Sequence, residues 1–436
     1  MIPCQPKVAS LVHSTGPSSS AEMDLADEQL IDAEIDSAPP PPPTRAQSLA
    51  ARVLLGASLV LIAFNLRPVF SSLSVLLPEI MQSTGISPSS ASLMTTLPVL
   101  CLGLFAPIAP ELARRFGAER TILAMLAVLA LGTGMRGFAT VPALLAGSAF
   151  AGASIAVVNV LLPGLVKRDF PTHAAMMTGL YTMALCAGAA GAAGFTVPLE
   201  HVLGGEWPRA LAVWAVPAVV VFLLWAPQAI RSKAAQRRTM PHGPGLWRDP
   251  LAWQVTLFMG LQSALAYCVF GWLAPILRER GLDAVTAGAV VSVSVLIQML
   301  ACLMVPSIAV RGRDQRLINV LLVGAAVAGL LGCLFAPLAT VWFWAVLQGS
   351  GQGGLIAVAM TLIILRSPDA HVAAQLSGMA QGVGYVLAAC GPLIVGFLRD
   401  WTGSFDAAGL MFIAIGVTAA LCGLGAGRAR QVGARG

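Results

Sequence analysis

An arginine stands near the middle of a long apolar segment, in the string Asn65-Leu66-Arg67-Pro68. A charged side chain at the centre of a membrane helix costs at least about 2.5–3.5 kcal/mol, so an ionisable residue there is a candidate for function. The guanidinium of Arg67 offers donors in a fixed fork that suits an anion, and Pro68 removes a backbone donor beside it. We expect Arg67 to bind solute, and the alternative is a structural contact with backbone carbonyls.

Amide and tyrosine side chains recur inside the other apolar segments. Those that we expect to contact solute, or alternatively to bond neighbouring helices, are Asn65, Asn159, Tyr181, Gln262, Gln348, Gln352, Gln381 and Tyr385. Two of these amides, in the first and seventh segments, stand at equivalent depths and could face each other across a central cavity. The alternative is that each forms helix–helix hydrogen bonds worth about 0.6–2 kcal/mol.

The sequence lacks the residue patterns of catalytic, metal-binding and nucleotide-binding sites. The carboxylates outside the N-terminal tail fall at or beyond the ends of the apolar segments, with Glu79 and Glu111 nearest the interior. The cysteines stand singly without a C-x-x-C spacing, which disfavours a metal site, and no phosphate loop or nucleophile elbow occurs. We therefore expect no enzyme, no cofactor and no metal. Proton coupling stays open: Glu79 would be its carrier, and the alternative is that Glu79 caps a helix at the membrane interface.

The elements that must position these residues are membrane helices. Of the 436 residues 57% are apolar and 11% are charged, whereas a soluble domain carries about a quarter charged residues. Apolar runs of about 20 residues match the thickness of a bilayer, and helices satisfy their own backbone groups there. The predicted helices are 50–80, 89–113, 120–137, 141–166, 173–197, 208–228, 251–277, 286–310, 317–337, 341–365, 372–398 and 407–427.

Basic residues predict the orientation of these helices. With the N-terminus inside, fourteen Lys and Arg residues fall in the inner loops, and four fall outside: Arg209, Arg278, Arg280 and Arg399. Cytoplasmic loops carry such an excess, so we expect a multi-pass protein of the cell (inner) membrane with both termini in the cytoplasm. The net charge of +6 thus reflects topology, and nucleic acid is not an expected partner.

The chain divides at its longest inner loop. We expect a disordered, acidic, proline-rich cytoplasmic tail over 1–48, a six-helix bundle over 49–228, a cytoplasmic linker over 229–250, a second bundle over 251–427 and a cytoplasmic tail over 428–436. Short strings repeat between the halves at offsets of 197 to 199, as in Pro78 and Pro275. Such a repeat predicts an all-α fold of two pseudo-symmetric bundles, with solute bound between them near the midplane.

Two strings resemble one branch of the major facilitator superfamily, the family of cyanate transporters and 2-nitroimidazole exporters. They are Asn65-Leu66-Arg67-Pro68 and Pro163-Gly164-Leu165-Val166-Lys167-Arg168-Asp169-Phe170-Pro171. The resemblance extends over about residues 52 to 425. It implies a secondary transporter that alternates access to a midplane site for a cyanate-like anion or a nitroimidazole-like compound.

The string Leu112-Ala113-Arg114-Arg115-Phe116-Gly117 departs from the superfamily signature, which has an Asp where Arg114 stands. By resemblance that Asp helps to latch the inner gate, so this chain needs another acid, such as Glu111 or Asp169. The residues that we expect to form the inner gate are Glu111, Arg114, Arg115, Arg120, Arg168 and Asp169.

Two alternatives to this transporter remain. One is a transporter of the same fold that exports drug-like compounds, and the other is a membrane sensor or scaffold that does not transport. In either case we expect a small-molecule ligand, contact with the lipid bilayer and a monomer.

Overall fold

The computed structural model describes residues 49–170, 173–231, 246–309, 311–312, 314–368 and 370–433. Contacts divide the chain into Met1–Arg52 and Val53–Gly436, and every contact discussed below lies within the second unit. The predicted tail over 1–48, residues 232–245 of the predicted linker and residues 434–436 of the C-terminal tail lie outside the described residues.

Among the described residues, twelve helical spans are long and apolar enough to cross a membrane, which confirms the predicted number. The first six, which we call the N-terminal half, consist of α2 (Leu49–Asn65), α3 (Pro68–Val75), α4 (Leu77–Thr84), α5 (Pro88–Phe105), α6 (Ala109–Phe116), α7 (Ala118–Met135), α8 (Val141–Asp169), α9 (Ala174–Val202), α10 (Trp207–Val213) and α11 (Ala215–Arg231). The C-terminal half consists of α12 (Pro250–Glu279), α13 (Ala284–Ala309), α14 (Arg316–Phe335), α15 (Val341–Leu365), α16 (Ala370–Thr402) and α17 (Asp406–Ala426).

The sequence explains where several helices begin and end. Asp249 caps α12 by accepting hydrogen bonds from the backbone of Leu251 and Ala252, as acidic side chains commonly do at helix starts. Asp283 accepts one from Thr286 at the start of α13, and this bond holds the pKa of the Asp283 carboxyl below its ordinary value. Gly85 ends α4 with a φ of 68°, a conformation that glycine adopts without steric cost.

The first span is broken at its centre. The helix α2 ends at Asn65, and α3 begins at Pro68, with Arg67 as its N-cap residue. Proline cannot donate the backbone hydrogen bond that would continue α2, so the carbonyl of Phe64 is free of that partner. A Cβ on Gly188 of α9 would lie 2.0 Å from the carbonyl oxygen of Phe64, and so α9 packs against the break only because residue 188 is glycine.

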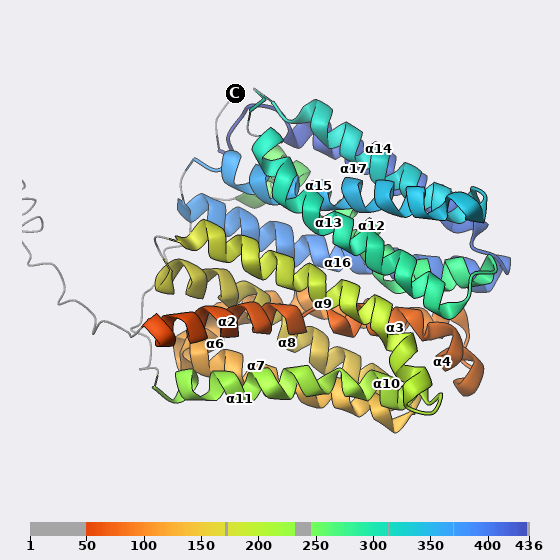
Figure 1. Ribbon diagram of the computed structural model, residues 1–436. Helices are drawn as coiled ribbons and strands as arrows, with labels where there is room; N and C mark the ends of the chain where they lie inside the picture. The colour runs from red at the N-terminus through yellow and green to blue at the C-terminus, as the bar shows by residue number, and fades with distance from the viewer. Residues whose placement is uncertain are drawn as a thin grey trace, which may run out of the picture. The chain divides into compact units, whose positions relative to one another are not determined.

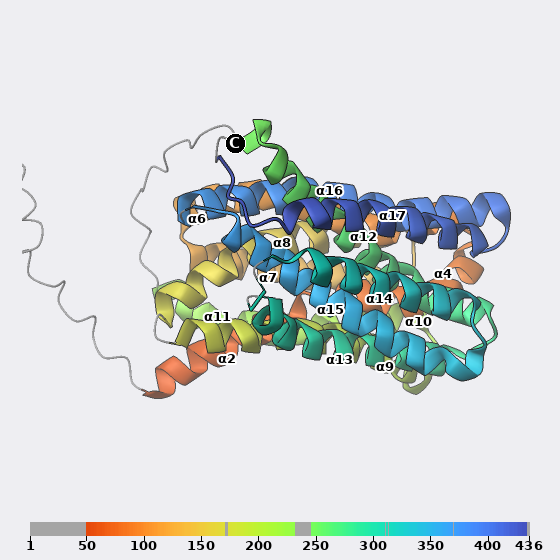
Figure 2. The same cartoon turned by 90° about the horizontal axis from the view of Figure 1, so that it is seen from above.

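The two halves form two six-helix bundles, drawn in orange to green and in green to blue in Figure 1. Between them, α5 packs against α16, α9 against α13 and α3 against α12. The helices α9 and α13 run side by side in both ribbon views (Figure 2). A Cβ on Gly103 of α5 would lie 2.7 Å from the carbonyl oxygen of Gly382 of α16. Small residues thus let the halves approach closely, as is common between membrane helices.

The two ends of the bundle are named here by their helices. The α2 end is the one where α2 begins, and the α4 end is the one where α4 lies (Figure 1). Odd-numbered spans run from the α2 end to the α4 end, and even-numbered spans run back.

Candidate functional site

The break in the first span holds Arg67 between the two halves. Its Nη1 donates a hydrogen bond of 3.3 Å to the hydroxyl of Tyr267, which belongs to α12 of the other half. Arg67 remains partly exposed, whereas its neighbours Leu66 and Pro68 are buried. The side chain therefore reaches across the interface from a position where the helix itself is interrupted.

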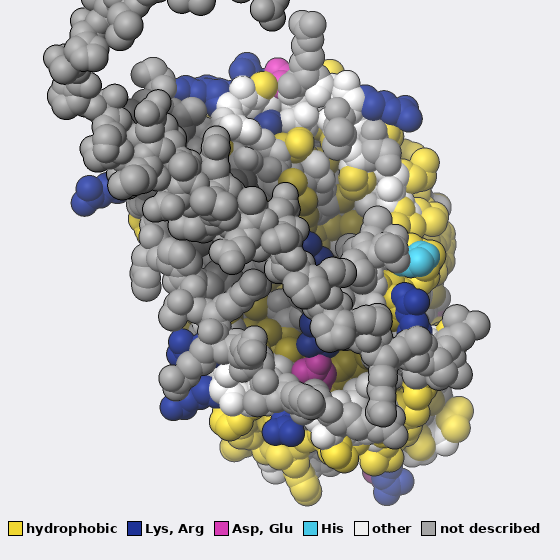
Figure 3. All heavy atoms as spheres, turned by 90° about the vertical axis from the view of Figure 1, so that its left-hand side faces the viewer, with side chains coloured by type: hydrophobic (Ala, Val, Ile, Leu, Met, Phe, Trp, Pro, Cys, Tyr) yellow, Lys and Arg dark blue, Asp and Glu magenta, His cyan; other side chains and the backbone are white. Residues whose placement is uncertain are grey.

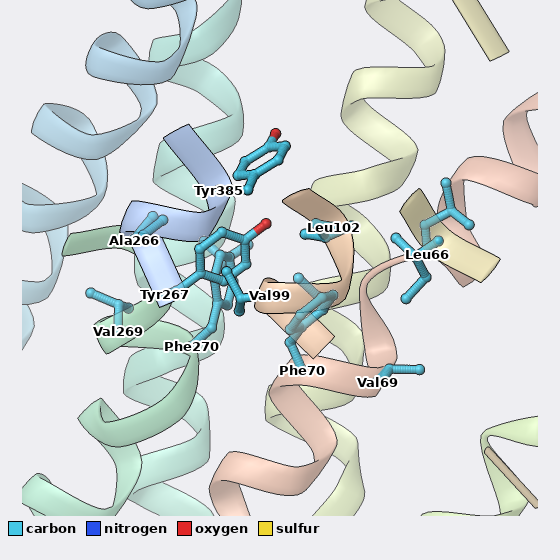
Figure 4. Packing of buried hydrophobic residues seen from close by; sticks show 14 of the residues in the cluster. Leu66, Val69, Phe70, Val99, Leu102, Ala266, Tyr267, Val269, Phe270 and Tyr385 are labelled. Carbon is cyan, nitrogen blue, oxygen red and sulfur yellow. The ribbon is translucent and has the colours of Figure 1, made fainter. Parts of the chain in front are cut away.

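Aromatic rings surround the guanidinium. The Cζ atom of Arg67 lies 6.0 Å from the ring centroid of Phe70, 5.9 Å from that of Tyr267 and 5.9 Å from that of Phe270. A cation so placed is attracted by a ring face, by about 0.5–1 kcal/mol at exposed sites and more when desolvated. Tyr385 of α16 packs edge-on against Tyr267, with ring centroids 6.2 Å apart. Figure 4 shows Tyr267, Phe270 and Tyr385 gathered opposite Phe70. We call these four rings and Arg67 the arginine cluster.

Arg67 has no carboxylate partner in the part of the chain that the structure describes. Its hydrogen-bond partner is a phenol, and a guanidinium has five N–H donors. Most of this donor capacity therefore stays available, and the partial exposure of the side chain gives a ligand access to it. The cluster therefore offers hydrogen-bond donors, a positive charge and ring faces, which are the groups that a small anion or a polar group on a flat ring requires.

The cluster is closed toward the α4 end. A cavity on that side is lined by Val69, Phe70, Leu73, Met94, Thr95, Pro98, Tyr267, Phe270 and Gly271. Its volume is about 10 Å³, which is room for about one water molecule. Beyond it two polar contacts join the halves. Glu79 of α4 forms an ion pair with Arg278 of α12, and the Ser89 hydroxyl of α5 donates to the Asp400 carboxylate of α16 at 2.5 Å.

Access to Arg67 therefore comes from the α2 end. Figure 3 shows this end of the molecule, where Lys and Arg side chains lie among hydrophobic ones around the residues drawn in grey. Tyr181 of α9 and Gln381 of α16, two of the predicted solute contacts, are partly exposed and lie on the α2 side of the cluster. The structure is thus a state that is open at the α2 end and closed at the α4 end.

Three predicted amides lie elsewhere, inside the C-terminal half. Gln262, Gln348 and Gln352 are 0%, 1% and 1% exposed. The Gln352 Nε2 donates to the carbonyl oxygen and to the Oε1 of Gln262, at 3.0 and 3.1 Å, and the Ser294 hydroxyl donates to the Gln348 side chain. These bonds join α12, α13 and α15, which corresponds to the helix–helix alternative that the sequence left open.

The remaining predicted contacts have separate surroundings. The Asn65 side chain donates to the carbonyl of Leu61 in its own helix at 2.8 Å, so it does not meet Gln262 across the interface. The Gln381 amide donates to the Ser377 hydroxyl at 2.8 Å. Asn159 of α8 is partly exposed. Among the amides and tyrosines predicted from the sequence, Tyr385 joins the arginine cluster.

The predicted gate residues gather at the α2 end, in the N-terminal half. Glu111 pairs with Arg114 and, at 3.7 Å, with Arg115. Arg168 pairs with Asp169 at 2.7 Å and with Glu119 at 2.6 Å. The Arg120 Nε donates to the Ala229 carbonyl at 3.4 Å. Each of these contacts joins parts of the same half. The Arg168–Glu119 and Arg120–Ala229 contacts tie α7 to α8 and to α11, whereas the Glu111 pairs lie within α6.

Sequence reasoning missed three members of the cluster and one buried cation. Tyr267, Phe70 and Phe270 were not singled out, although the chain has only three tyrosines and Tyr267 stands 200 residues after Arg67, close to the repeat offset. Arg136, at the end of the third predicted helix, is 0% exposed. Its guanidinium donates to the Val69 carbonyl at 2.8 Å and to the Ser148 hydroxyl at 3.2 Å. It therefore anchors α3, and with it the segment that bears Arg67, to the third and fourth spans.

Comparisons with known proteins agree with this architecture. A model of the Major Facilitator Superfamily matches residues 54–346. The 2-nitroimidazole transporter of Escherichia coli (strain K12) is 38% identical over 384 residues, which cover 87% of this chain and 97% of that protein. The cyanate transport protein CynX of the same organism is 30% identical over 349 residues, which cover 80% and 90%. The crystal structure of a D-xylose-proton symporter superposes with a TM-score of 0.67 at 14% identity and covers 88% of this chain and 98% of its own.

Proposed function

Since this chain belongs to the major facilitator superfamily, in the branch of the cyanate and 2-nitroimidazole transporters, we propose that its solute is a small anion bound by Arg67. The protein is a multi-pass secondary transporter that works by alternating access.

The observation that carries the proposal is a partly exposed arginine between the halves that has a phenol and no acid as its partner. A guanidinium stays charged at any relevant pH. An anion that reaches it gains a charge-assisted hydrogen bond worth about 1.5–3 kcal/mol. Because Arg67 belongs to one half and Tyr267 to the other, a bound anion would touch both moving parts at once. Such a position is suited to trigger their rearrangement.

The related proteins suggest which solutes to try first. One is named for cyanate and another for 2-nitroimidazole. A cyanate ion and a nitro group each present small acceptor atoms to the fork of an arginine, and a nitroimidazole adds a flat ring. The rings of Phe70, Tyr267 and Phe270 around the guanidinium favour a second candidate function, the export of a neutral aromatic compound.

We place the α2 end in the cytoplasm of a cell whose inner membrane holds the protein. The basis is the excess of Lys and Arg in the loops at that end. The observed state then faces inward, and both termini are cytoplasmic. Arg67, Tyr267 and Tyr385 all come from one chain, so we propose that a monomer is sufficient for transport. Proton coupling would require a carboxylate, and the only carboxylate that links the two halves in an ion pair of the described residues is Glu79.

The test is uptake by proteoliposomes that contain Arg67→Ala, Arg67→Lys or the wild type, with radiolabelled cyanate and 2-nitroimidazole as probes. We expect Arg67→Ala to lose uptake at least tenfold and Arg67→Lys to keep weak uptake, because a lysine retains charge without the fork. Arg209→Ala, an exposed arginine paired within its own helix turn, is the control and should leave uptake unchanged. Normal uptake of either probe by Arg67→Ala would show that Arg67 is structural. A neutral aromatic probe carried equally well by all variants would favour the export function.

A further inference from the structure

The helix α3, with Arg67 as its N-cap residue, has few polar contacts that could fix its orientation. The break before Pro68 interrupts the hydrogen-bond ladder of α2, so tertiary contacts must set the place of α3. Arg67 bonds only to Tyr267, which belongs to the other half. The hydroxyl side chains of α3 are buried and have no hydrogen-bond partner among the described residues; they are Ser71, Ser72 and Ser74.

One side chain of the N-terminal half hydrogen-bonds to α3 from outside. Arg136, which follows α7, donates to the Val69 carbonyl at 2.8 Å and to the Ser148 hydroxyl of α8 at 3.2 Å. Among the described residues, no other side chain of this half makes a hydrogen bond to α3. Val69 stands two residues after Arg67, so this bond fixes the first turn of α3, from which the Arg67 side chain extends.

Stability alone does not account for an arginine at position 136. The side chain is 0% exposed, its Nε is buried without a partner, and it pairs with no carboxylate in the described part of the chain. A charge taken out of water destabilises a fold unless other groups compensate it, and an apolar side chain of similar volume is often as stable or more so. The bond to Val69 therefore indicates a role for Arg136 in placing α3.

We propose that Arg136 is a positioning residue, which holds α3 so that the guanidinium of Arg67 stands beside Tyr267 and within reach of the solute. This role rests on the proposed function, in which Arg67 binds the solute. Arg136 acts through Arg67, since it is fully buried and does not touch the solute itself. Without it, α3 can turn against α9 and α12, the helices on which it packs, and the affinity for solute falls.

The first measurement follows the Arg67–Tyr267 contact without any solute. The chain has three tyrosines, so protein labelled with fluorotyrosine gives three fluorine NMR resonances, which single Tyr→Phe variants assign. Arg136→Met removes the charge and both hydrogen bonds and keeps an unbranched side chain. We expect it to move the Tyr267 resonance toward its position in Arg67→Ala and to leave the Tyr181 resonance in place.

The second measurement is uptake of cyanate and 2-nitroimidazole by proteoliposomes. Arg136→Met should raise KM about fivefold, as for the loss of one hydrogen bond, with a maximal rate within about twofold of the wild type. Its Tm should stay close to the wild-type value. Arg136→Lys, which keeps a donor for the Val69 carbonyl, should bring KM back toward the wild type. Tyr267→Phe should raise KM by less than about twofold further in Arg136→Met, because both changes remove the same contact.

Arg280→Met is the matched control. Arg280 also donates to two main-chain carbonyls, those of Cys333 and Ala336, but within the C-terminal half. Its replacement should change neither the Tyr267 resonance nor KM.

A Tyr267 resonance and a KM equal to those of the wild type in Arg136→Met would overturn the positioning role. So would a fall in Tm with an unchanged KM, which a purely structural arginine predicts. Should Arg136→Met fail to insert, Ser148→Ala gives the same test, because it removes one of the two partners of the guanidinium and leaves its charge. It should shift the Tyr267 resonance in the same direction, and no shift would overturn the positioning role.

Arg67→Ala, measured alongside, separates this role from the proposed function. If Arg67→Ala loses uptake while Arg136→Met keeps the wild-type KM, the anion function stands and the positioning role falls. If the Tyr267 resonance moves in Arg136→Met while Arg67→Ala carries both probes normally, Arg136 does position Arg67 and the proposed function falls.

Discussion

At the scale of single residues, the arginine cluster is a charge held by a phenol and three rings. The hydroxyl of Tyr267 is the member that contacts Arg67 by a hydrogen bond, and the ring of Tyr385 supports Tyr267 edge-on. The two tyrosines therefore have different roles, although both lie within the cluster.

Tyr267→Phe should weaken solute binding by about 1 kcal/mol, the value of an ordinary hydrogen bond, because at 3.3 Å the bond to Arg67 is long; this is about a fivefold rise in KM. Tyr385→Phe is the matched control, since it removes a hydroxyl that makes no defined bond to Arg67, and it should change KM less than twofold. Uptake kinetics in proteoliposomes give both values. Equal effects of the two substitutions would contradict the assigned roles.

The sequence predicted the charge at this site and part of its surroundings. Arg67 stood out because a cation is rare at that depth, and Tyr385 stood out as a polar ring inside a helix. Tyr267 and Phe270 did not, because the hydropathy of a helix that is buried all round does not reveal which face meets the other half. Twenty-two consecutive or nearly consecutive positions of α12, from Ala252 to Leu277, are buried. Which of them touch Arg67 depends on helix rotation, which only the tertiary packing sets.

At the scale of elements, buried amides hold the C-terminal half together. Gln352 of α15 bonds Gln262 of α12, and Gln348 of α15 accepts from Ser294 of α13. The spacing of these amides along their helices was readable from the sequence. The sequence did not show whether these amides face the cavity or a neighbouring helix, because a polar side chain next to glycines fits both environments.

Gln352→Leu should therefore act on stability and leave specificity unchanged. The substitution leaves the Oε1 of Gln262 without its donor in a buried site, which costs about 1–2 kcal/mol. We expect a fall of several degrees in the Tm of the detergent-purified protein, with KM for solute within twofold of the wild type. A tenfold rise in KM without a change in Tm would place Gln352 in the solute site instead.

Another element-scale feature lies at the α2 end, where Arg366 follows α15. Its Nε donates to the Ala426 carbonyl at 2.8 Å and its Nη2 donates to Gln315, while its own carbonyl accepts from Val432 at 2.8 Å. Burial lowers the pKa of Arg366, and the nearby charge of Asp314 partly offsets this. Arg366 was counted among the inner Lys and Arg residues that predict the orientation. The structure shows that it also joins α14, α15 and α17, a packing role that its charge alone does not reveal.

At the scale of the whole molecule, the fold followed from the sequence because membrane helices are long, apolar and separated by short charged loops. The number of spans agreed with the prediction, and the two-bundle fold is that of the superfamily. The conformational state could not be predicted. It depends on small differences between contacts at the two ends, such as the Glu79–Arg278 pair, that open and close in every cycle.

The central claim is that the two halves alternately expose the arginine cluster to opposite sides. Thr95 tests it most directly, because it lines the cavity of about 10 Å³ between that cluster and the α4 end and is 7% exposed. In a background without native cysteines, Thr95→Cys should resist a membrane-impermeant maleimide applied at the α4 side, and it should react at least tenfold faster when cyanate or 2-nitroimidazole is being carried. Uptake at the normal rate with Thr95→Cys still unreactive during transport would contradict alternating access through this cavity.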